Sequence, residues 1–166
     1  MDKKLYLLAE LDDNTQKIVR KFYGKILEEN IIGTQTKDIP YHISLCSYSI
    51  ENEKNIITLL NKIKGKFNVI EILFGGFGLF GLNVLFFNPA MNKNLIELYD
   101  FCKSNSYNKD NAFTAHMTLL IDEPDKIIKI LPKISNEYKA FTGKIVSISL
   151  YEFFPKRFIH KINLMI

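Results

Sequence analysis

The sequence predicts an α+β fold built from two copies of one strand–helix–strand–helix–strand unit. Two observations carry this prediction. The pattern His-x-(Ser/Thr)-Leu occurs twice, at His42–Leu45 and His116–Leu119, each time within an apolar run typical of a strand. The elements expected around the two copies also follow in the same order, which indicates a duplication.

The first unit is expected to contain a strand, a helix, the first histidine strand, a second helix and a closing strand. Acidic and amide residues at 12–14 supply the N-cap of the first helix. Hydrophobic periodicity gives the expected bounds as Leu5–Leu11, Thr15–Glu29, the strand that follows Pro40, Glu51–Lys64 and Lys66–Phe74.

The second unit begins after the glycine-rich stretch Gly75–Gly78 and repeats this order. Its expected bounds are Leu82–Phe87, Asn92–Ser104, Phe113–Ile121, Asp125–Tyr138 and Phe141–Phe153. A last extended run, Arg157–Met165, has no counterpart in the first half. We therefore expect one domain, 1–166, made of two pseudo-symmetric lobes at about 1–78 and 79–166.

Each histidine motif places an imidazole and a hydroxyl on one face of its strand. Side chains alternate along a strand, so His42 lies beside Ser44, and His116 beside Thr118. Two such strands brought together suit displacement at a phosphodiester, with one histidine as base, the other as acid, and the hydroxyls on the non-bridging oxygens. A structural histidine in a half-buried strand is the alternative for either copy alone, but the repetition favours a shared site.

These motifs and their flanks resemble those of the 2H phosphoesterase superfamily, also called the 2′-5′ RNA ligase or RNA 2′,3′-cyclic phosphodiesterase-like family. The flanking similarity includes Phe113 before the second motif and the run Phe77–Phe80 between the motifs. The resemblance implies a bilobal fold with antiparallel sheets around a central cleft, and catalysis without a metal or other cofactor. One departure is Ile121, which occupies a position where many such proteins carry an arginine.

By this resemblance, His42 and His116 are the expected catalytic residues, and Ser44 and Thr118 are expected to bind the phosphate. The expected function is a metal-independent phosphoesterase acting on 2′,3′-cyclic phosphates of nucleotides or RNA ends. Activity on 2′-5′ linkages, including ligation by the reverse reaction, is a further option. The alternatives are a module that binds nucleotides or RNA ends without turnover, and an RNA-trimming exonuclease of the same superfamily.

Three other residues near the motifs carry separate expectations. Tyr48 has the same strand parity as His42, so it is expected to stack on a base or ribose, with a core position as the alternative. Cys46 has the same parity and is expected to be a small packing residue. His160 has no hydroxyl in register and no metal-site spacing around it, so it is expected outside the site.

Composition limits the class of protein and its partners. The net charge is +4 and the pI is about 8.9, with scattered lysines, which suits a small anionic substrate or an RNA end better than a long duplex. The most apolar stretch, Phe67–Phe87, contains Glu71, Asn83 and four glycines, which indicates sheet core and not a membrane span. Two cysteines make no disulfide framework. We therefore expect a cytoplasmic protein with no membrane partner and no obligate protein partner.

Overall fold

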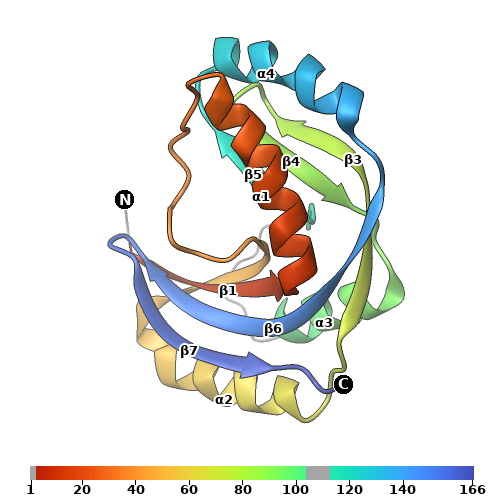
Figure 1. Ribbon diagram of the computed structural model, residues 1–166. Helices are drawn as coiled ribbons and strands as arrows, with labels where there is room; N and C mark the ends of the chain where they lie inside the picture. Colours follow the sequence, from red (N-terminus) through yellow and green to blue (C-terminus); the bar gives the residue numbers. More distant parts are fainter. Residues whose placement is uncertain (1–2, 104–112) are drawn as a thin grey trace.

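The computed structural model describes residues 3–103 and 113–166, and these residues form an α+β fold (Figure 1). The elements, in chain order, are β1 Lys4–Leu11, α1 Asp13–Glu28, β2 His42–Ser49, η1 Ile50–Asn52, α2 Glu53–Lys64, β3 Ile70–Phe80, β4 Val84–Pro89, α3 Lys93–Lys103, β5 Met117–Ile121, α4 Pro124–Glu137, β6 Phe141–Phe153 and β7 Arg157–Asn163. The predicted order of elements is confirmed, and most predicted bounds lie within a few residues of the observed ones. The predicted end of the third helix, Ser104, lies outside the described residues.

The strands form one seven-stranded antiparallel sheet in the order β2-β1-β6-β3-β4-β5, with β7 paired to β6. The order reads the same from both ends if β1, β2 and β3 are exchanged with β4, β5 and β6, as a duplication requires. The third strand of each repeat pairs with the first strand of the other repeat: β6 pairs with β1, and β3 pairs with β4. The division near residue 78 therefore separates the two repeats in the sequence, but each half of the sheet contains strands from both repeats.

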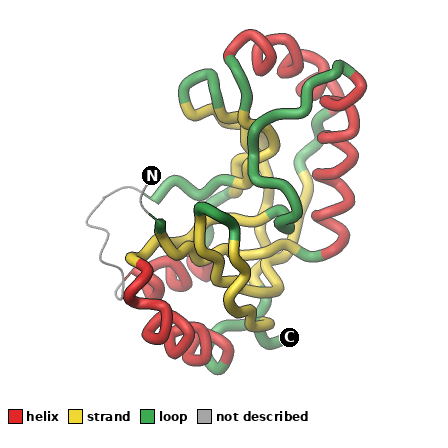
Figure 2. Tube along the Cα trace, turned by 90° about the vertical axis from the view of Figure 1, so that its left-hand side faces the viewer, coloured by secondary structure: helices red, strands yellow, loops and turns green. Residues whose placement is uncertain are grey.

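The helices gather in two groups at opposite ends of the molecule (Figures 1 and 2). Helices α2 and α3 contact β7 and β2, whereas α1 contacts β5 and α4. None of the helices in the described residues is long and apolar enough to cross a membrane.

The sheet is curved so strongly that its two end strands approach each other. β2 and β5 stand at opposite ends of the strand order, yet residues of the two strands come within 8 Å, Cα to Cα. Strand twist and β-bulges both contribute to such curvature. The consequence is that the two strands carrying the histidine motifs face one another.

Strand β3 differs most from its prediction. It starts later than expected, at Ile70, and continues through the glycine-rich stretch to Phe80. Gly78 helps to explain why the strand continues through this stretch. The ring of Phe86 on β4 lies directly over Gly78, and a Cβ at that position would come within 2.3 Å of the ring. The glycine-rich stretch was expected to separate the two units, but it is part of β3, and Gly78 admits an aromatic ring from the neighbouring strand.

The same β-bulge occurs in both histidine motifs, at the leucine that follows the hydroxyl. Leu45 is the extra residue of β2, because Leu7 pairs with Cys46 while Leu8 pairs with Ser44. Leu119 is the extra residue of β5, because Leu85 and Phe86 on β4 pair with the residues on either side of it. The bulges reverse the alternation of side chains beyond each motif.

The bulge in β2 corrects the prediction for Tyr48, which does not face the cleft. Its ring is 1% exposed, and its hydroxyl donates a hydrogen bond to the carbonyl of Cys102 in α3 at 3.1 Å. The same reversal places Cys46 opposite Leu7, on the core face, as befits the predicted packing residue. Tyr48 is therefore a core residue and not a stacking platform.

Replacing Tyr48 tests its structural role. Tyr48→Ala should lower the free energy of unfolding by about 3–5 kcal/mol, the usual effect of deleting a large buried aromatic side chain. Tyr48→Phe keeps the ring and removes one hydrogen bond, so the loss should be about 1 kcal/mol. Urea titrations of both variants would measure these losses. An unchanged stability in Tyr48→Ala would contradict the core position.

Candidate active site

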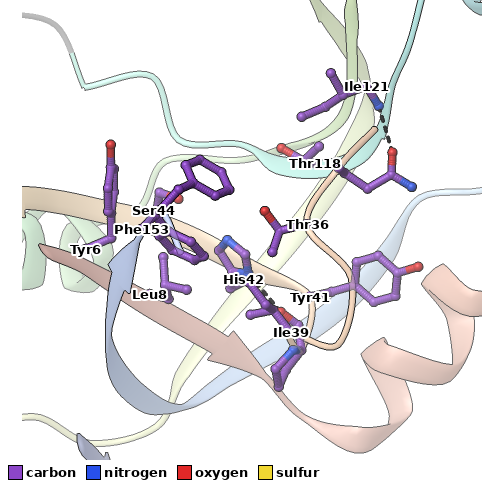
Figure 3. Close-up of a pocket in the computed structure, with 13 residues that line it drawn as sticks. Tyr6, Leu8, Thr36, Ile39, Tyr41, His42, Ser44, Thr118, Ile121 and Phe153 are labelled. Atoms are coloured by element: carbon purple, nitrogen blue, oxygen red, sulfur yellow. Dashed lines mark hydrogen bonds between the residues drawn. The ribbon is translucent and has the colours of Figure 1, made fainter. Parts of the chain in front are cut away.

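One pocket, of about 260 Å³, is lined by residues from both histidine motifs (Figure 3). His42 and Ser44 reach it from β2, and Thr118 reaches it from β5. The remaining lining residues are Tyr6, Leu8, Gln35, Thr36, Ile39, Pro40, Tyr41, Ile121, Phe153 and Phe154. The curved sheet thus brings together three of the four motif residues that the sequence singles out.

His116 precedes β5 and lies close enough to His42 for the two rings to interact electrostatically. The two imidazoles are held in the same way. Nδ1 of His42 lies 2.8 Å from the carbonyl oxygen of Pro40, and Nδ1 of His116 lies 2.8 Å from that of Thr114. A carbonyl oxygen only accepts, so each Nδ1 carries the hydrogen, and each Nε2 remains for proton exchange.

The surroundings of the two rings differ. His116 is half-buried and packs against a pair of touching aromatic rings, those of Phe80 and Phe86, at centroid distances of 4.8 Å and 5.5 Å. Phe86 reaches this position because Gly78 leaves room for it. These contacts orient His116 from β3 and β4. The contact between Phe86 and His116 could not be predicted from the sequence, because the packing of Phe86 over Gly78 depends on strand register.

Two backbone attachments fix the chain ahead of His42. The buried amide of Gln16 in α1 accepts a hydrogen bond from the backbone N–H of Tyr41 at 2.9 Å and donates one to its carbonyl at 2.8 Å. Tyr41 directly precedes His42, so Gln16 sets where β2 begins. A glutamine in an amphipathic helix gives no sequence signal for this role.

The loop over residues 33–41 forms one wall of the pocket and is tied to β5. Thr34 donates its backbone N–H to the carbonyl of Ile121 at 2.7 Å, and the Gln35 side chain accepts from the N–H of Ile121 at 3.1 Å. At the far end, Lys156 donates to the carbonyl of Lys37 at 3.0 Å. These bonds hold Thr36 in the pocket lining, between His42 and Thr118 as drawn in Figure 3. Thr36 adds a third aliphatic hydroxyl to those of Ser44 and Thr118 in the lining, and the sequence analysis did not identify it.

Burial lowers the pKa of His42 below its ordinary value, and the positive charge that His116 can carry acts in the same direction. Two interactions oppose this shift: the hydrogen bond to Pro40 and the charge of Glu10, which pairs with His42 across the strands. The carboxylate of Glu10 is buried and is itself paired with Lys161 at 2.5 Å. His42 therefore favours its neutral form.

The third histidine lies apart from this arrangement. His160 pairs with Leu150, on the face of the sheet opposite to that of Glu10 and its partner Ser149. In the part of the chain that the structure describes, no group of three histidine, cysteine, aspartate or glutamate residues is arranged to hold a metal ion.

Similarity to known proteins is evident in structure and not in sequence. No protein-family model and no curated protein matches the chain. Among solved structures, E. coli LigT in its apo form superposes with a TM-score of 0.64 at 15% identity, covering 99% of this chain and 98% of LigT. E. coli LigT complexed with 3′-AMP gives 0.63 at 15% identity, with 99% of each chain covered. A crystal structure described as a phosphoesterase gives 0.60 at 15% identity, also with 99% of each chain covered. The fold expected from the resemblance is thereby confirmed.

The lowered pKa of His42 predicts how stability depends on pH. The unfolded chain binds this proton more tightly than the folded chain does, so stability should be lost as the pH falls below about 6.5, the ordinary histidine value. His42→Gln removes this contribution, so the loss of unfolding free energy between pH 7 and pH 5 should be smaller in that variant. Urea titrations at both pH values would measure the difference. An equal loss in both chains would contradict the lowered pKa.

Proposed function

We propose that this protein is a metal-independent phosphoesterase that opens 2′,3′-cyclic phosphates of nucleotides or RNA ends. The observation that supports this most directly is the repeated geometry at the site. Two imidazoles, each fixed through Nδ1 by the carbonyl two residues before it, accompany two hydroxyls on facing strands. Binding alone does not need two positioned proton-transfer groups, whereas displacement at a phosphodiester does.

The reaction follows from these groups. Nε2 of a neutral histidine takes a proton from water as the water oxygen bonds to phosphorus. The bond from phosphorus to one ribose oxygen breaks, and the second histidine, in its protonated form, gives its proton to that oxygen. Ser44 and Thr118 donate hydrogen bonds to the non-bridging oxygens as negative charge develops there. Ligation would be the same sequence in reverse, with a hydroxyl in place of water.

The lowered pKa of His42 supports a role for this residue as the base, because a base must be neutral at the start of the reaction. His116 would then be the acid. The fold adds support for a nucleotide ligand, since E. coli LigT, to which the chain is similar in structure, has been crystallised with 3′-AMP.

Turnover of 2′,3′-cyclic nucleotides, measured with and without EDTA, tests this function. We expect a bell-shaped dependence of kcat/KM on pH and no loss of rate with EDTA, because imidazoles and hydroxyls supply every role. Activity that vanished with EDTA and returned with zinc would refute the metal-free mechanism.

Alanine variants of the two motif histidines should be strongly impaired. His42→Ala and His116→Ala should each lower kcat/KM by about 10²–10⁴, the usual range for losing a positioned acid or base. In the His42→Ala variant, kcat/KM should no longer fall at low pH. In the His116→Ala variant, it should no longer fall at high pH. His160→Ala, on the other face of the sheet, is the matched control and should keep full activity. Loss of activity only in the control would refute the assignment.

The three hydroxyls should contribute unequally. Ser44→Ala and Thr118→Val should each cost about 1.5–3 kcal/mol of transition-state stabilisation, because each removes a hydrogen bond to a charged group. Thr36→Val should cost about 0.5–1.5 kcal/mol and act mainly on KM, if its hydroxyl bonds the substrate at a neutral atom. Steady-state kinetics of the three variants would rank them. A larger loss of kcat in Thr36→Val than in the others would show that Thr36 stabilises the developing charge.

A further inference from the structure

Five aromatic residues form a continuous strip that begins in the pocket and crosses β1, β6 and β7. This aromatic strip consists of Tyr6, Tyr151, Phe153, Phe154 and Phe158. Phe153 is the centre, with ring centroids 5.5 Å from Tyr6, 5.9 Å from Tyr151 and 5.4 Å from Phe154. Tyr151 continues the strip to Phe158 at 5.4 Å. Tyr6, Phe153 and Phe154 also line the pocket that contains His42 and Ser44.

Strand register places the strip on the same face of the sheet as the candidate catalytic residues. Tyr6 pairs with Tyr151, which in turn pairs with Phe158. Two residues along β1 from Tyr6, Leu8 pairs with Ser44. Side chains of paired residues lie on one face, and neighbouring strands are about 4.8 Å apart. The strip therefore leads from the pocket sideways across about 10 Å of sheet, two strand spacings.

Tyr151 is a buried member of the strip and Tyr6 and Phe153 are half-buried, but the exposure of Phe154 and Phe158 is unusual for the chain. Of thirteen phenylalanines, three are exposed: Phe80 at 38%, Phe154 at 57% and Phe158 at 55%. Phe80 contacts His116, and the other two belong to the strip. Exposed aromatic rings gathered beside a pocket commonly mark a binding surface, because burying them against a ligand gains hydrophobic free energy.

The charges around the strip suit an anionic strand. Lys4 pairs with Phe153 across the strands and makes no ion pair within the described residues. The other nearby cations are engaged: Arg157 with Glu53 and Glu152, and Lys161 with Glu10. Lys4 thus remains as a cation for a phosphate group beside the rings.

We propose that the aromatic strip binds the bases that precede the reacting nucleotide, so that a single-stranded RNA end is a better substrate than a mononucleotide. This inference rests on the proposed function. In a strand that ends in a cyclic phosphate, every neighbouring nucleotide lies on the 5′ side, and the strip offers the stacking surface for it. Aromatic stacking tolerates any base, so binding depends on length and not on sequence.

The kinetic test compares a 2′,3′-cyclic mononucleotide with a trinucleotide that has the same terminal base. The ratio of kcat/KM for the trinucleotide to that for the mononucleotide should fall about 10-fold in Phe158→Ala, the loss expected for one stacked base. Ile128→Ala is the matched control. Ile128 is 56% exposed on α4, which lies at the other end of the molecule from β7 (Figure 1), so this variant should keep the ratio of the unmodified chain. A ratio that Phe158→Ala leaves intact would overturn the proposal.

A binding test separates this proposal from the proposed function. The chain has no tryptophan, so Phe158→Trp introduces a single fluorescent reporter into the strip. A trinucleotide 3′-phosphate should quench its fluorescence saturably, whereas the same ligand should not quench Ile128→Trp. Quenching without turnover would support the strip as an RNA-binding surface and refute the proposed enzymatic function. Turnover of the mononucleotide without quenching would support the proposed function and refute the role of the strip. Self-association that Phe158→Ala abolishes, without any effect of RNA, would assign the strip to a second copy of the chain and overturn its role in RNA binding.

Discussion

The site depends on one constraint: the sheet must curl until its first and last strands face each other. β2 and β5 are separated by four strands in the sheet. β2 carries His42 and Ser44, whereas β5 carries Thr118 and directly follows His116. The central pairing of β3 with β6, from Ile70–Ile145 to Phe74–Phe141, joins the two repeats and fixes how the halves of the sheet are oriented. Any change in this pairing would alter the separation of the two motifs, although neither β3 nor β6 carries a histidine of the site.

Duplication gives the site equivalent parts, and the differences between the repeats give these parts separate roles. The bulge after each hydroxyl and the bond from each Nδ1 to a carbonyl occur in both repeats. The environments are not equivalent, since His42 has Glu10 beside it and His116 packs against two phenylalanine rings. Acid–base catalysis needs one neutral and one protonated histidine, so such asymmetry is what the proposed reaction requires.

Sequence patterns predict this molecule well where the information is local. Periodicity locates the helices and strands. The repeated motif identifies His42, Ser44 and Thr118, which line the pocket, and also His116, which interacts electrostatically with His42. Strand parity fails beyond Ser44, because the bulge at Leu45 depends on pairing with β1 and reverses the side chain of Tyr48. The same limit applies to Thr36, which lies in a loop without periodicity. Its neighbours Thr34 and Gln35 place it through hydrogen bonds with Ile121, a residue far along the chain.

Among the residues that the structure describes, those that line the pocket include no lysine, arginine, aspartate or glutamate. Ile121, whose backbone is held by the 33–41 loop, contributes an apolar side chain to this lining. Recognition in the proposed reaction would therefore rely on hydroxyls, imidazoles and stacking, not on a fixed cation. A cyclic phosphodiester carries one negative charge and the monoester product carries up to two. One protonated histidine remains at the site and offsets one of these charges. Desolvating the second charge without a further cation is costly, so such a pocket favours the substrate over its product and assists release.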